Sequence, residues 1–195
     1  MSKTWPTFLT VLLALCLGMP VSAYDVPLTE SAIRDAYFLG TRLGGLNPDF
    51  LAGYARLVAD LKQGNCTSQA RLETPFLEVA EYAGKAPNYS AQRAVKDFSG
   101  KPLSFRIYLY VCYRQHAPAN AETVKIMQNK KEVVPNSFES SPYSESKEFG
   151  FLPPNGEQIV LEFAAAKIDS SDLTVLIDTS DGQHGETRFD LQTLR

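Results

Sequence analysis

One stretch limits the fold of this chain more than any other: Ser104–Arg114, with the sequence SFRIYLYVCYR. Its residues alternate between two faces, as they do in a β-strand. One face is apolar or aromatic throughout, whereas the other mixes tyrosine with serine, arginine and one cysteine. We therefore predict a strand that lies inside a sheet or is well covered on both faces.

The first 23 residues have the layout of a cleaved secretory signal peptide. Lys3 precedes the apolar run Phe8–Leu17, and the small-residue site Val21–Ala23 follows it. This order predicts cleavage after Ala23, and the run is too short for a standard membrane span. One alternative is a buried N-terminal helix, which rarely ends in such a site. The other is a lipid anchor at Cys16, which the large preceding residue disfavours.

Charge and length limit the classes of partner and the size of the core. Removing residues 1–23 removes one lysine and no acidic residue, so the net charge changes from −3 to −4. A mildly acidic chain argues against nucleic acid or an anionic membrane as the main partner. The remaining 172 residues suffice for one sizeable core and contain no second apolar run of spanning length. We expect a soluble protein, secreted or periplasmic, with no membrane span after signal cleavage.

Two cysteines remain after cleavage, Cys66 and Cys112. In an oxidising compartment such a pair predicts a structural disulfide, for which the chain-entropy model gives roughly 4 kcal/mol. The alternative is a reactive thiol or a metal site, but the spacing matches neither a redox motif nor a zinc motif. We expect no metal and no cofactor.

Helical patterns dominate the chain before the central strand. Thr29 can cap a helix that runs to about Leu43, and Asn47 can cap a second one that Gly64 ends. The apolar positions of the second helix are Phe50, Leu51, Tyr54, Leu57, Val58 and Leu61. The short link predicts an antiparallel helical hairpin, which the disulfide would tie to the central strand on the face of Tyr108.

The remaining patterns complete an α+β fold. The segment Thr67–Ala83 is ambiguous, because Thr74-Pro75 can start a helix, but we expect a short strand up to about Thr74. Ser90 can cap a further helix that ends before Gly100. After Thr123 the pattern changes to short alternating runs separated by turns, which is typical of an antiparallel sandwich. We expect residues 24–100 to form a mainly helical layer, residues 101–195 a β-sandwich-like part, and 24–195 one compact unit.

The segment Pro135–Gln158 is the one long stretch without periodicity, and we expect it to be a loop. Loops of this length are usually functional or disordered. It contains four aromatic residues, Phe138, Tyr143, Phe149 and Phe151. They make the segment a candidate binding loop, the alternative being a plain connection with partly buried rings.

No set of residues in the sequence indicates a particular reaction. His116 and His184 lack a metal-binding partner at helical spacing, and no nucleophile, phosphate or dinucleotide motif occurs. The late aspartates, around Asp178 and Asp181, suit calcium chemically but are better explained as turn formers. Two hypotheses follow: a non-catalytic module that binds a protein or cell-envelope component, or a secreted hydrolase that uses carboxylates.

Three groups of residues carry a resemblance to known proteins. They are Thr74-Pro75-Phe76; Tyr89-Ser90-Ala91-Gln92 with Ala94, Asp97 and Phe98; and Leu173-Thr174-Val175 through Asp181-Gly182 to Phe189-Asp190-Leu191. In these residues the chain resembles a group of uncharacterised secreted bacterial proteins. The resemblance covers most of the mature chain and includes no catalytic motif. It implies a bacterial, exported protein, and it assigns no functional residue.

Overall fold

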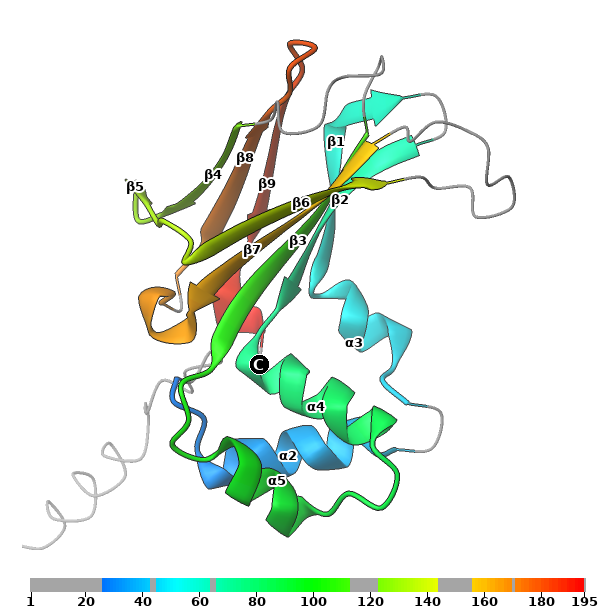
Figure 1. The fold of residues 1–195 in the computed structure, drawn as a ribbon, viewed down its shortest axis with the longest axis vertical. Helices are drawn as coiled ribbons and strands as arrows, with labels where there is room; N and C mark the ends of the chain where they lie inside the picture. The colour runs from blue at the N-terminus through cyan, green and yellow to red at the C-terminus, as the bar shows by residue number, and fades with distance from the viewer. Residues whose placement is uncertain are drawn as a thin grey trace, which may run out of the picture.

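The computed structural model of the chain describes residues 26–42, 45–63, 66–112, 123–143, 156–169 and 171–194. The expected signal peptide and the anchor alternative at Cys16 lie outside these residues. The described part contains four α-helices and nine strands in two antiparallel sheets (Figure 1). The α+β class that the sequence predicts is confirmed.

Side-chain caps start all four of these helices. The helices are α2 (Glu30–Gly40), α3 (Pro48–Ala52), α4 (Pro75–Lys85) and α5 (Ala91–Phe98). Thr29, Asn47, Thr74 and Ser90 each accept a hydrogen bond from a backbone N–H of the first turn. Such caps satisfy donors that would otherwise lack partners at a helix start. The predicted starts at Thr29 and Ser90 are confirmed.

The predicted second helix is wrong beyond Ala52, because the chain continues as strand β1 (Ala55–Gln63). Tyr54, Val58 and Leu61 are buried at spacings of four and three residues, which imitates a helix. The cause is an irregularity in the pairing of β1 between Leu57 and Lys62, which breaks the strict alternation of a strand. The helical hairpin is not confirmed, since α2 packs mainly against α4 and α5.

The first sheet has five strands in the order β1-β2-β3-β7-β6, and the second has four in the order β5-β4-β8-β9. The strands not yet described are β2 (Cys66–Glu73), β3 (Ser104–Cys112), β4 (Thr123–Gln128), β5 (Lys131–Glu132), β6 (Ser137–Tyr143), β7 (Gly156–Ala164), β8 (Leu173–Asp178) and β9 (His184–Phe189). The predicted central strand is β3, the middle strand of the first sheet. The segment expected to be mainly helical also supplies β1 and β2.

The loop predicted over Pro135–Gln158 is wrong in part. Ser137–Tyr143 forms β6, an edge strand that pairs antiparallel with β7, which itself begins at Gly156. An edge strand with one side open needs no continuous apolar face, so the serines and the proline of β6 hid it from a hydrophobicity pattern.

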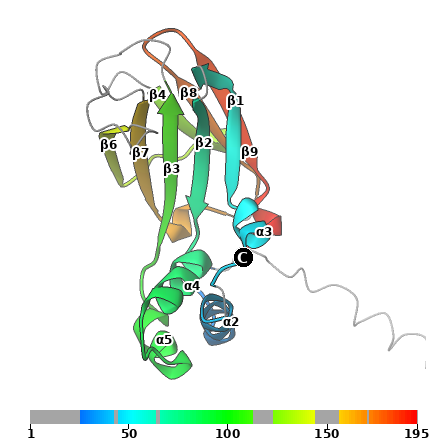
Figure 2. The ribbon, with the colours of Figure 1, turned by 90° about the vertical axis from the view of Figure 1, so that its right-hand side faces the viewer.

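Two hydrophobic clusters organise the interior. The larger one takes buried residues from both sheets, so the sheets share one core. The smaller one lies among α2, α4 and α5, which sit at one end of the first sheet (Figure 2). Helix α4 belongs to both, because Leu77 enters the sheet core while Phe76 and Val79 enter the helical cluster. This helix therefore joins the two layers.

The predicted disulfide between Cys66 and Cys112 is present, with Cα atoms 6.0 Å apart. Its predicted role as a staple between helices and sheet is wrong. Cys66 begins β2 and Cys112 ends β3, and these neighbouring antiparallel strands meet there at the end of the sheet remote from α4. The disulfide therefore joins two adjacent strands of the same sheet.

Candidate functional site

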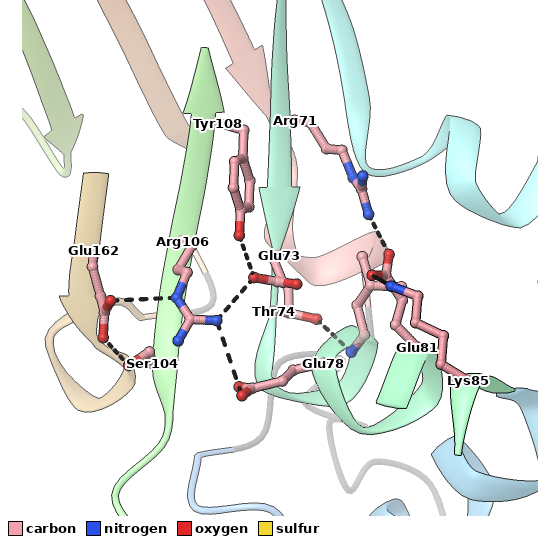
Figure 3. Close-up of polar contacts among 11 residues, drawn as sticks. Arg71, Glu73, Thr74, Glu78, Glu81, Lys85, Ser104, Arg106, Tyr108 and Glu162 are labelled. Atoms are coloured by element: carbon pink, nitrogen blue, oxygen red, sulfur yellow. Dashed lines mark hydrogen bonds and ion pairs between the residues drawn. The ribbon is translucent and has the colours of Figure 1, made fainter. Parts of the chain in front are cut away.

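A cluster of charged side chains lies where the first sheet meets α4. Glu73, Arg106 and Glu162 are direct neighbours across β2, β3 and β7. Arg106 donates from Nη1 to Glu73 Oε2 at 3.1 Å and from Nε to Glu162 Oε2 at 3.3 Å (Figure 3). The polar face that the sequence predicts for the central strand thus carries a cation held between two carboxylates.

The cluster extends to the helix and to both sides of Arg106. Glu78, in the first turn of α4, has Oε1 4.0 Å from Arg106 Nη1. The hydroxyl of Tyr108 donates to Glu73 Oε2 at 2.9 Å, and Ser104 donates to Glu162. Three strands and one helix therefore meet at a single guanidinium.

The surroundings change the proton affinity of these groups in opposite directions. Burial, opposed by Arg106 and reinforced by Glu73 and Glu162, raises the pKa of Glu78. The hydrogen bond from Ser104, opposed by burial and helped by Arg106, lowers the pKa of Glu162. Burial and the neighbouring Glu73 raise the pKa of Tyr108 to about 12. Glu78 is therefore easier to protonate than Glu162.

Beside the cluster lies a cavity of about 530 Å³. Its lining residues come from the end of α2, the following turn, α3, β1, β2 and α4: Gly40, Gly45, Leu46, Leu51, Ala55, Arg71, Ala80, Glu81, Gly84 and Lys85. Glycine is required where α2 crosses α4, because a Cβ on Gly40 would lie 1.9 Å from the carbonyl oxygen of Ala80. This close crossing sets one wall of the cavity.

The charged part of the cavity lining consists of Arg71, Glu81 and Lys85. Arg71 projects from β2 and donates to Glu81 on α4, and Lys85 Nζ lies 3.3 Å from the other carboxylate oxygen of Glu81 (Figure 3). The side chain of Glu81 is 17% exposed, that of Arg71 38% and that of Lys85 77%. Both cations therefore remain accessible to a bound molecule.

The residues that the sequence singled out lie elsewhere. Phe138 is on β6 and is half-exposed, Tyr143 ends that strand, and Phe149 and Phe151 lie outside the described residues. The binding-loop hypothesis therefore stays a prediction. His184 Nδ1 lies 2.6 Å from Asp178 Oδ1 on the exposed surface, away from both the cluster and the cavity.

Of the late aspartates, Asp178 ends strand β8, and Asp181 lies in the turn between β8 and β9. Asp181 accepts hydrogen bonds from the side chains of Thr179 and Gln183, and Asp169 accepts them from Asn129 and Ser171. Within the described ranges, no three His, Cys, Asp or Glu side chains are grouped so that they could hold a metal ion. The same ranges contain no helix with the length and apolar character needed to cross a membrane.

No protein family, curated protein or solved structure matches the chain. Most carboxylates of the cluster and the cavity are paired with a cation: Glu73 and Glu162 share Arg106, and Glu81 contacts Arg71 and Lys85. Such an arrangement suits holding a molecule in place better than moving protons, with Glu78 as the exception.

Proposed function

We propose that this protein is an exported, non-catalytic binding module whose ligand occupies the cavity among α2, α3 and α4. The cavity carries this proposal: its volume lies in the range of about 300–1,000 Å³ that is usual for ligand sites. It combines apolar lining, from Leu46, Leu51 and Ala55, with a few charged groups that can orient a ligand. This division of roles is typical of small-molecule sites.

The proposed export is supported by the N-terminal pattern and by the disulfide. A structural disulfide is stable in oxidising compartments and rare in reducing ones. The resemblance to secreted bacterial proteins agrees with this location. We propose that a sandwich-like pair of sheets acts as the rigid support, and that the ligand belongs to a protein or to a component of the cell envelope.

A cavity-filling variant tests the proposal. Ala55→Phe adds a ring at a β1 position that lines the cavity, whereas Leu57→Phe adds one two residues along the same strand, where the side chain is already 64% exposed. Compounds from cell-envelope extracts are screened for those that raise the melting temperature of the wild-type protein. A ligand of the cavity stabilises the wild type and Leu57→Phe but not Ala55→Phe. Equal stabilisation of all three proteins would contradict the proposal.

Glu78 supports a second candidate, the carboxylate-dependent hydrolase. Its raised pKa is the property that a general acid needs, and Glu73 and Glu162 lie on the same guanidinium as potential partner carboxylates. Under this alternative, Glu78→Gln abolishes turnover of a polysaccharide or peptide substrate while the ligand-induced shift in melting temperature persists. Absence of turnover in the wild type across such substrates leaves the binding module as the better description.

A further inference from the structure

We infer that the cavity takes a small organic anion with an aliphatic body, whose carboxylate is bound by Arg71 and Lys85. This inference rests on the proposed function, since it names the chemical class of the ligand in the same cavity. Its starting point is the charge of the lining: two cations and one carboxylate, Glu81. The cavity thus has a local excess of one positive charge in a chain whose net charge is −3.

The donors of the two cations exceed what Glu81 can use. A guanidinium carries five N–H donors and an ammonium three, while one carboxylate has two oxygens. Glu81 is held through one oxygen by Arg71 and through the other by Lys85. A second carboxylate can therefore bind to both cations without displacing Glu81, and arginine in particular favours the planar geometry of a carboxylate.

The helix ends disfavour a ligand with more than one negative charge. The C-terminal turns of α2 and α4 line the cavity through Gly40 and Gly84, and such turns carry partial negative charge. Lys85, in the last turn of α4, offsets this charge at its own helix. A singly charged group matches the remaining positive charge, whereas a dianion would exceed it.

The rest of the lining selects the body of the ligand. Leu46, Leu51, Ala55 and Ala80 line the cavity with aliphatic side chains, and none of the ten lining residues within the described part of the chain is aromatic. Burial of apolar surface favours an aliphatic body in such a space. A medium-chain carboxylate fulfils both conditions, and octanoate serves as the probe.

Calorimetric titration of the full mature chain tests the inference with three probes of equal chain length. Octanoate binds, while octanol, which lacks the charge, binds at least about tenfold more weakly. Octylamine binds more weakly than octanol, because the two cations repel it. Octanoate binding that is no tighter than octanol binding would overturn the inference, as would tighter binding of octylamine.

Charge variants locate the anion. Arg71→Gln weakens octanoate binding about tenfold, and Lys85→Gln weakens it about two- to fivefold, since Lys85 is the more exposed. Lys96→Gln is the matched control, because it removes one charge from the last turn of α5, outside the cavity. Glu81→Gln strengthens binding, because it frees both cations. Equal effects of Lys85→Gln and Lys96→Gln would overturn the inference.

The experiments distinguish an error in the inferred ligand class from an error in the proposed ligand cavity. If no carboxylate binds but some other ligand stabilises Leu57→Phe and not Ala55→Phe, the inference is wrong and the proposed function stands. If no ligand discriminates between Ala55→Phe and Leu57→Phe, the proposed function fails as well. Circular dichroism of each variant checks that the fold is intact. Lys85→Gln is the variant expected to fold like the wild type, because the side chain of Lys85 is 77% exposed.

Discussion

The two ends of the first sheet are held together by different kinds of interaction. At one end the disulfide between Cys66 and Cys112 joins β2 to β3 covalently. At the other end, about 23 Å further along β2, Arg106 joins β2, β3, β7 and α4 through charges alone. The covalent end connects two neighbouring strands, whereas the charged end connects two layers.

The disulfide end of the sheet is purely structural, whereas the charged end lies beside the candidate ligand cavity. A disulfide does not respond to protonation or to a charged ligand, and it acts mainly by restricting the unfolded chain. A cluster of one cation and three carboxylates responds to both pH and salt. The candidate ligand cavity lies at the charged end, where pH and salt can change the interactions. We expect perturbations of the two ends to have distinct signatures.

Removal of the disulfide should have the largest effect on stability. The double variant Cys66→Ala with Cys112→Ala is expected to lose about 4 kcal/mol of unfolding free energy, because the unfolded chain regains the entropy of an open loop. Chemical unfolding followed by circular dichroism measures this loss. Reduction of the wild type should give the same midpoint as the double variant. A loss that depends strongly on pH would contradict the proposed division between the two ends.

The disulfide was also the part of the fold that the sequence revealed best. The signal peptide expected from the sequence leaves two cysteines after cleavage, and two cysteines have only one possible pairing, so the bond between Cys66 and Cys112 could be predicted without any structure. Their structural role could not be predicted, because the apolar residues after Asn47 recur at helical spacing. The irregular pairing of β1 placed Val58 and Leu61 at helical spacing, and local pattern alone cannot separate the two cases.

The charged end was hidden from the sequence for a different reason. Glu73, Arg106 and Glu162 are far apart in the chain and become neighbours only through strand pairing. The signal that existed was Arg106 on the polar face of a predicted central strand, because a cation in that position requires partners. The cavity left no local signal, since it depends on how α2 crosses α4 at Gly40.

Loss of Arg106 should have the second-largest effect. Arg106→Met leaves Glu73, Glu78 and Glu162 without their common cation, and we expect a cost of about 2–3 kcal/mol, since its side chain is 28% exposed. Hydrogen exchange should increase in α4 before it increases near the disulfide. The matched control is Arg188→Met, which removes an arginine that is 71% exposed and paired with Glu186, and which should cost no more than about 0.5 kcal/mol. Equal costs for the two variants would show that Arg106 does not join the layers.

The smallest expected effect concerns Glu78 and Glu162, whose contributions to the free energy of unfolding change in opposite directions with pH. The folded pKa of Glu78 lies above its ordinary value of 4.5, so the folded state binds more protons than the unfolded state just above pH 4.5. Glu78 therefore adds stability in acid, which is lost as the pH rises through its folded pKa. The folded pKa of Glu162 lies below 4.5, so its contribution is present above that pH and is lost on acidification.

The two glutamine variants turn this difference into a measurement. Near pH 7, Glu78→Gln should raise the free energy of unfolding by less than about 1 kcal/mol, because it removes a carboxylate that burial disfavours. Glu162→Gln should lower it by about 1 kcal/mol, and this loss should shrink as the pH falls below 4.5. Unfolding curves at several pH values between 3 and 7 compare the variants with the wild type. If both substitutions change stability in the same direction at pH 7, burial does not govern Glu78, and the general-acid alternative loses its support.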